Sequence, residues 1–212
     1  MTSLIQLIQE NHRSLNIDLF DGGQGKKIHD YCLNHLDHSK PHIMTDKYYC
    51  HSYIPIYDEL FKEYKEKPIN LLEIGVLHGG SANLWSKYFT NGNIYGMELN
   101  EMADWLVNHE TIKVLQTDAY STTALTAFNN IQYDIIIDDG PHTLESMIYF
   151  IENYIYKVNK NGLLIIEDIK SLQWVSELMQ KIPKDVTYVY KVHDLRKKIG
   201  RFDDIMLILK IR

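Results

Sequence analysis

The chain from residue 69 onward alternates short apolar runs with amphipathic stretches. Continuous apolar runs of strand length occur at residues 70–74, 93–97, 112–115, 133–137 and 163–166. Apolar residues at helical spacing fill the intervals at 81–89, 101–108, 119–128 and 143–158. Strands separated by helices predict βαβ units and a parallel sheet. Because the strand runs are mostly apolar and do not alternate with polar residues, we expect helices to cover both faces of this sheet.

The two ends of the chain follow other patterns. Before residue 69 the spacing predicts short helices at 1–11, 28–36 and 53–64, with a glycine-rich turn at 21–25. Near the other end, 186–192 and 205–211 have the composition of two strands joined by a basic loop. We therefore predict an α/β fold with a Rossmann-like, doubly wound, mostly parallel sheet and an antiparallel C-terminal edge strand. We expect a helical N-terminal extension over 1–68 and a single structural unit over 69–212.

Composition narrows the class of protein. The chain has 212 residues, 45% of them hydrophobic and 24% charged, as in an ordinary globular domain. A net charge of −6 argues against binding of nucleic acid through its phosphates. The start has no signal-peptide pattern and no segment has the run of apolar residues that a membrane span needs, so we expect a cytoplasmic protein. Cys32 and Cys50 lack the spacing of metal ligands and are expected to be free thiols.

Carboxylates follow two of the predicted strands. Asp139 and His142 come after the fourth strand, and Glu167 and Asp168 come directly after the fifth. Because the carboxyl ends of adjacent parallel strands meet at one edge of a sheet, we expect these four side chains to lie together. Carboxylate oxygens select Mg²⁺, Mn²⁺ or Ca²⁺ over zinc, and an imidazole beside them suits a general base. Alternatively, Asp139-Gly140 forms a simple turn, Glu167-Asp168 caps the next helix and His142 is a surface residue.

A glycine-containing turn follows the first predicted strand. Gly75 and Gly79 are separated by three residues, and Glu73 precedes them. The dinucleotide fingerprint G-x-G-x-x-G is missing, and an acid at this place would repel a pyrophosphate. The E-x-G-x-x-x-G arrangement resembles motif I of the class I S-adenosylmethionine-dependent methyltransferases. A close-packing turn without a ligand is the alternative.

Acids also end the next two predicted strands. Glu98 is at the place where a doubly wound nucleoside-binding fold has the carboxylate that binds the ribose hydroxyls. Asp118 ends the third strand, where class I methyltransferases commonly contact the adenine amine. A helix N-cap is the alternative for Asp118.

The acidic pairs carry a more specific resemblance. Asp139-Gly140-Pro141-His142 followed by Glu167-Asp168 resembles the metal-dependent sugar O-methyltransferases of macrolide biosynthesis, the mycinamicin and tylosin type. Thr45-Asp46-Lys47, His51-Ser52-Tyr53 and Tyr57 resemble the segment that precedes their cofactor domain. The common D-G-S-H form is D-G-P-H here, which keeps both functional side chains.

That resemblance implies the class I methyltransferase fold, with S-adenosylmethionine and Mg²⁺ (or Mn²⁺) as cofactors. It assigns His142 as the base and Asp139, Glu167 and Asp168 as metal ligands. For the cofactor pocket it implies Glu73, Gly75, Gly79, Ser81, Glu98, Asp118, Asp138 and Thr45.

The predicted activity is transfer of a methyl group to a hydroxyl of a sugar, free, nucleotide-linked or part of a glycan. We expect a small-molecule or glycan substrate, no nucleic acid and no membrane partner, and leave a homo-oligomer open. The nearest alternative is a catechol-type O-methyltransferase, whose second acidic pair is usually Asp-Asn. An NAD-dependent oxidoreductase, which lacks support from the glycine pattern, and a non-catalytic binding module are further alternatives.

Overall fold

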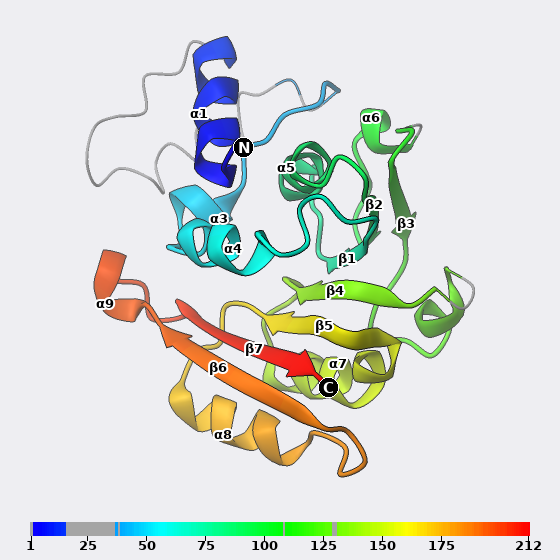
Figure 1. Ribbon diagram of the computed structural model, residues 1–212, viewed down its shortest axis with the longest axis vertical. Helices are drawn as coiled ribbons and strands as arrows, with labels where there is room; N and C mark the ends of the chain where they lie inside the picture. The colour runs from blue at the N-terminus through cyan, green and yellow to red at the C-terminus, as the bar shows by residue number, and fades with distance from the viewer. Residues whose placement is uncertain (1, 16–36, 38, 108, 129–130) are drawn as a thin grey trace.

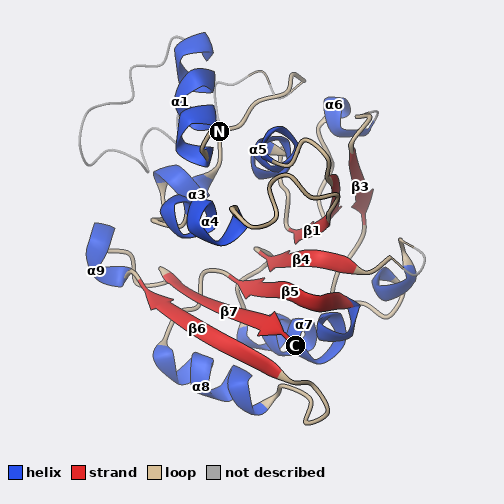
Figure 2. Cartoon of the chain, viewed as in Figure 1, coloured by secondary structure: helices blue, strands red, loops and turns tan. Residues whose placement is uncertain are grey.

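The structure is a computed structural model that describes residues 2–15, 37, 39–107, 109–128 and 131–212. A seven-stranded sheet in the order β3-β2-β1-β4-β5-β7-β6 runs through the molecule, with helices on both of its faces (Figures 1 and 2). The strands are β1 (Asn70–Ile74), β2 (Asn93–Glu98), β3 (Ile112–Gln116), β4 (Tyr133–Asp138), β5 (Val158–Ile166), β6 (Tyr188–Asp194) and β7 (Ile205–Ile211). The α-helices are α1 (Leu4–Leu15), α3 (Asp46–Tyr49), α4 (Ile54–Phe61), α5 (Gly80–Tyr88), α6 (Asp104–Val107), α7 (Leu144–Tyr154), α8 (Leu172–Gln180) and α9 (Arg196–Ile199).

The strand order reverses between β1 and β4. The chain moves outward from β1 through β2 to β3 and then returns to place β4 on the other side of β1, and all these neighbours are parallel. In open α/β sheets, ligands bind beyond the carboxyl ends of the strands at such a reversal. The topology therefore predicts a ligand site beyond the ends of β1 and β4, where Gly75 and Asp139 follow.

The predicted doubly wound α/β fold is confirmed, with one refinement at the C-terminal end. β7 pairs antiparallel with β5 on one side and with β6 on the other. The antiparallel strand β7 is therefore internal, and the edge strand is β6, antiparallel to its one neighbour. This arrangement brings the start of β7 beside the carboxyl end of β5.

Alternating residues of the central strands enter two different cores. Ile135 and Ile137 of β4 pack on the face covered by α1, α4 and α5, whereas Ile136 packs on the face covered by α7 and α8. All three are fully buried. Because successive strand residues point to opposite faces, a strand covered on both sides is apolar at most of its positions, as the sequence indicated.

The N-terminal segment belongs to one of these cores. Leu4 and Ile8 of α1 and Tyr57 and Phe61 of α4 are fully buried in the cluster that also contains the central strands. The ring of Tyr57 meets that of Trp85 on α5 edge to face, with centroids 5.3 Å apart. Among the described residues, the predicted extension and the sheet therefore share a hydrophobic core.

Several predicted elements differ in the structure. The predicted helix at 119–128 is turns with a 3₁₀ helix at Ala124–Thr126. The Oγ of Ser121 donates to the Asp118 carbonyl and accepts from the Ala124 N–H, and such side-chain bonds compete with helical ones. Helix α8, capped by the Ser171 side chain, was not predicted, and α9 occupies the predicted basic loop. The predicted turn at 21–25 and helix at 28–36 lie outside the described residues, and within the described part every helix is too short or too polar to cross a membrane.

Candidate functional site

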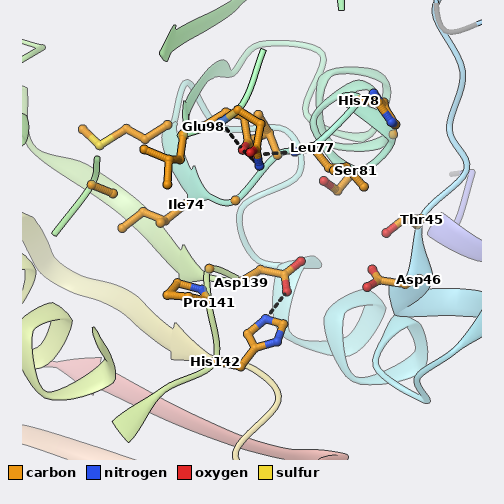
Figure 3. A pocket seen from close by; sticks show the side chains of 18 of the residues that line it. Thr45, Asp46, Ile74, Leu77, His78, Ser81, Glu98, Asp139, Pro141 and His142 are labelled. Carbon is orange, nitrogen blue, oxygen red and sulfur yellow. Dashed lines mark hydrogen bonds and ion pairs between the residues drawn. The ribbon is translucent and has the colours of Figure 1, made fainter. Parts of the chain in front are cut away.

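A pocket of roughly 450 Å³ opens at the carboxyl ends of β1, β2, β3 and β4 (Figure 3). Thr45 and Asp46 line it from the N-terminal segment, opposite the strand ends. The predicted site residues among those that line it are Thr45, Gly75, Ser81, Glu98, Asp118, Asp139 and His142. Residues from distant parts of the chain therefore share one cavity at the place where the topology predicts a ligand.

Gly75 lies where the turn after β1 touches the turn after β4. Its φ is 82°, and a Cβ built there would lie 2.0 Å from the carbonyl oxygen of Asp139. Only glycine allows the turn after β1 to approach the turn after β4 so closely. The backbone that would face a cofactor is thus in direct contact with the backbone that carries the acidic site.

Glu98 is a buried carboxylate that orders the turn above the pocket. One of its oxygens accepts from the Leu77 N–H at 2.8 Å, and the other accepts from the backbone and side-chain amides of Asn100, each at 2.8 Å. Leu77 has a φ of 47°, unusual for a residue with a side chain. Asp118 is exposed and accepts from the Tyr120 N–H at 2.9 Å. A carboxylate oxygen has two lone pairs, so the Glu98 oxygen that accepts only from Leu77 and both oxygens of Asp118 retain acceptor capacity for a ligand.

Three predicted cofactor residues lie outside the set that lines the pocket: Glu73, Gly79 and Asp138. Glu73 is fully buried and accepts from the Ser81 Oγ at 2.7 Å and the Trp85 Nε1 at 3.1 Å. Burial raises the pKa of Glu73 to about 7, against the opposing charge of Lys47. Asp138 accepts from the Tyr120 hydroxyl, and burial raises its pKa to about 6. Glu73 and Asp138 thus hold two side chains that line the pocket, Ser81 and Tyr120.

Two carboxylates and an imidazole converge at one end of the pocket. Ligand atoms of Asp139, His142 and Asp168 all lie within 4.8 Å of one another. The Nε2 of His142 is 3.0 Å from an oxygen of Asp139 (Figure 3), and its Nδ1 is 3.5 Å from an oxygen of Asp168. His142 and Asp168 have φ values of 53° and 54°, a conformation that costs free energy for non-glycine residues and is concentrated at functional sites.

The charge of His142 follows from these contacts. Burial opposes the imidazolium form, but the hydrogen bond and the charge of Asp139 outweigh it and raise the pKa of His142 to about 9. Asp168 and Asp138 act in the same direction. In the metal-free protein, the carboxylates thus keep this imidazole protonated at neutral pH.

Glu167 is close to this cluster but is bonded to other side chains. Its Oε1 accepts from the Tyr57 hydroxyl, and its Oε2 lies 2.5 Å from the Nζ of Lys47. The same ammonium pairs with Asp139 and, at 3.3 Å, with Glu73. Burial opposes the charged form of Lys47, but the carboxylates of Asp139 and Glu167 outweigh it and hold its pKa well above the ordinary value.

A second set of side chains surrounds Asp168. The Tyr53 hydroxyl donates to its Oδ1 at 2.7 Å, and the Nδ1 of His51 lies 3.2 Å from the same oxygen. The same nitrogen lies 3.2 Å from an oxygen of Asp204, which is fully buried just before β7. The sequence predicts no role for His51 or Asp204. The resemblance had singled out the segment with Lys47, His51, Tyr53 and Tyr57, but the only signal for Asp204 is an acid directly before an apolar run.

The donor set fits a hard divalent cation. Oxygens of Asp139 and Asp168 and a ring nitrogen of His142 lie within 4.8 Å of one another, and such ions take carboxylate oxygens and complete their coordination with water or substrate oxygens. The oxygens of Glu167 are bonded to Tyr57 and Lys47, so this carboxylate lies beside the cluster. That Glu167 is a metal ligand stays a prediction.

Comparisons with known proteins find similarity to methyltransferases. Residues 72–169 match a family model described as a methyltransferase domain. The 8-demethyl-8-alpha-L-rhamnosyl tetracenomycin-C 2'-O-methyltransferase of Streptomyces olivaceus is 30% identical over 142 residues, which cover 61% of this chain and 36% of that protein. Mycinamicin VI 2''-O-methyltransferase of Micromonospora griseorubida is 30% identical over 135 residues, which cover 59% of this chain and 33% of that protein. The chain spans about one third of the length of these curated relatives.

A solved structure shares the fold. The methyltransferase MycE of the mycinamycin pathway, in complex with Mg, SAH and mycinamycin VI, aligns with a TM-score of 0.63 and 22% identity, covering 79% of this chain and 51% of that chain. This likeness is one of fold. The family match and the curated relatives confirm the predicted resemblance to class I methyltransferases of the macrolide-sugar type.

Proposed function

We propose that this chain, whose residues 72–169 match a methyltransferase-domain model, transfers a methyl group from S-adenosylmethionine to a hydroxyl of a sugar with the help of Mg²⁺ or Mn²⁺. The observation that carries the proposal is the direct contact between Gly75 and Asp139, which joins the pocket over the β1 and β2 ends to the acidic cluster. The sugar O-methyltransferases among the relatives support the choice of acceptor.

Residues at the ends of β1, β2 and β3 would hold the methyl donor. The backbone of Gly75 leaves space for close approach, and Glu98 offers carboxylate oxygens to the ribose hydroxyls. Asp118, exposed at the other end of the pocket, is available to the adenine amine. The donor supplies an electrophilic methyl group on a sulfonium.

His142 would act on the acceptor hydroxyl as the base. As the hydroxyl oxygen forms a bond to the methyl carbon, the carbon–sulfur bond breaks, S-adenosylhomocysteine leaves and the hydroxyl proton passes to the imidazole. Asp139, at 3.0 Å, orients the ring and stabilises the imidazolium that forms. A charged catalytic partner that is already in place requires no reorganisation during the reaction.

Asp139 and Asp168 would hold the divalent cation, with Glu167 beside them. When bound, such an ion lowers the pKa of a coordinated hydroxyl and orients it. The same cation would also offset the negative charge that holds a proton on His142. This end of the pocket therefore suits a sugar with a free hydroxyl. Separately, we propose that the reaction takes place in the cytoplasm, as the sequence suggests.

A methyl-transfer assay tests the proposal. The protein is incubated with methyl-labelled S-adenosylmethionine, Mg²⁺ and two acceptor panels, one of free, nucleotide-linked and macrolide-linked sugars and one of catechols. Label in a sugar ether is the expected result, whereas label in catechols alone would show that the acceptor is a catechol and not a sugar. Calorimetry with S-adenosylhomocysteine and with NAD tests the pocket separately, because binding of NAD alone would refute the methyltransferase proposal.

A further inference from the structure

The two oxygens of Asp168 have different surroundings. Oδ1 accepts from the Tyr53 hydroxyl at 2.7 Å and lies 3.2 Å from the Nδ1 of His51. Oδ2 faces the Nδ1 of His142 at 3.5 Å. One oxygen is thus anchored on the protein side, and the other is presented to the candidate cation site.

The anchor continues to a carboxylate directly before the C-terminal strand β7. Asp204 is fully buried, and its Oδ1 lies 3.2 Å from the same Nδ1 of His51. Its Oδ2 has no hydrogen-bond partner among the described residues. The backbone fixes this position, because the Ile169 N–H, one residue past Asp168, donates to the carbonyl of Ile205 at 3.0 Å.

The ring of His51 is held in one plane. Its side chain is 2% exposed, and it stacks on the Tyr53 ring with centroids 4.8 Å apart and an angle of 15° between the planes. A ring nitrogen carries at most one hydrogen, so Nδ1 serves both carboxylates with a single donor. A buried carboxylate without a donor costs free energy, and His51 supplies a donor to Asp204.

We propose that His51 and Asp204 form a buried pair that positions Asp168, with Asp204 orienting the imidazole and the imidazole fixing the carboxylate that faces His142. The inference rests on the proposed function insofar as Asp168 serves a cation site. It gives the internal antiparallel strand β7 a role in that site, since β7 begins directly after Asp204. Both residues are positioning residues, because they act through Asp168.

Crystal structures of the metal-free wild-type protein and of Asp204→Asn and His51→Ala test the geometry directly. We expect the carboxylate of Asp168 to rotate in both variants, so that Oδ2 no longer faces His142. Mn²⁺ binding, measured by electron paramagnetic resonance, should weaken about tenfold, because residues that orient metal ligands typically contribute 10- to 100-fold to affinity. His51→Asn should restore most of the affinity, because its amide nitrogen replaces Nδ1 as a donor.

Asp194→Asn is the matched control. It removes the same charge from the same β6–β7 hairpin, but Asp194 is exposed and pairs with Arg196. An unchanged Asp168 orientation in both variants would overturn the inference, whatever the metal data show. Failure of the wild-type protein to bind Mn²⁺ would instead refute the proposed cation, while the crystal structures still decide the positioning role. If Asp204→Asn does not fold, His51→Ala and His51→Asn give the same decision.

Discussion

Lys47 and Glu167 are 120 residues apart in the chain, and their side chains meet in the interior with the Nζ 2.5 Å from an oxygen of Glu167. Each is only 1% exposed. The same ammonium also pairs with Asp139 and Glu73, so a single cation neutralises part of a cluster of three carboxylates. The N-terminal segment therefore contributes to the charge balance of the acidic site as well as to the core.

Replacement of Lys47 by methionine should destabilise the protein strongly. The substitution keeps the length of the side chain but leaves Glu73, Asp139 and Glu167 buried without their shared counter-charge. Removing one partner of a buried ion pair typically costs about 3–5 kcal/mol. The free energy of unfolding in urea, measured without metal, checks this expectation.

Lys62→Met is the control for that experiment. Lys62 is exposed and pairs with the exposed Glu59, a kind of ion pair that contributes about 0–1 kcal/mol. Equal free energies of unfolding for the two variants would show that the buried cluster does not depend on Lys47.

Gly75→Ala should abolish binding of S-adenosylhomocysteine and lower the melting temperature. The new Cβ would lie 2.0 Å from the Asp139 carbonyl oxygen, so one of the two turns must move. Gly200→Ala shares the strain of a positive φ, 78°, but has no atom within 4 Å of the added Cβ. The control should cost about 1–2 kcal/mol and leave binding intact. Equal affinity of the two variants in calorimetry would argue against the Gly75 contact as a part of the pocket.

His142→Ala should reduce the rate of methyl transfer about 10²- to 10⁴-fold, the usual contribution of a positioned base, without loss of S-adenosylhomocysteine binding. Asp139→Asn should lower the rate as well, because it removes both the orienting charge and a ligand for the cation. His193→Ala, on the edge strand β6 and outside the pocket lining, serves as the control. A variant at position 142 with the wild-type turnover would exclude the imidazole as the base.

Removal of divalent cations should stop the reaction. Excess EDTA is expected to abolish methyl transfer, and Mg²⁺ or Mn²⁺ added beyond the chelator should restore it. Binding of S-adenosylhomocysteine should persist in EDTA, because its proposed contacts come from Gly75, Glu98 and Asp118. Full turnover in excess chelator would eliminate the cation from the mechanism.

The metal-free protein should lose stability as the pH rises above neutrality. Asp139 and its neighbours raise the pKa of His142 from the ordinary 6.5 to about 9, so the folded state holds a proton that the unfolded chain releases. This contribution is fully present below pH 6.5 and disappears as the pH passes through 9. Nuclear magnetic resonance titration of the His142 ring and unfolding curves between these pH values measure it. His142→Ala should flatten that part of the stability profile, and an unchanged slope would contradict the contact with Asp139.

The sequence by itself determined the sheet and the place of the site. Continuous apolar runs predicted the central strands, because a strand covered on both faces is apolar at most of its positions and not only at alternate ones. Asp139, His142 and Asp168 could be expected at one edge, since parallel strands deliver their carboxyl ends to the same side. The stretch at 119–128 was misassigned because hydroxyl side chains such as Ser121 bond the local backbone in place of a helical ladder.

Only the tertiary structure decided which way each carboxylate is turned. Glu73 and Asp138 end strands as predicted, yet the first meets Ser81, Trp85 and Lys47 and the second meets Tyr120. Lys47, Tyr53 and Tyr57, which donate to Glu167 and Asp168, lie more than 100 positions earlier in the chain. Asp204 is brought to the site directly before an antiparallel strand. Local patterns specify where a strand ends, but the donors that compensate a buried charge are brought to it by packing over long sequence distances.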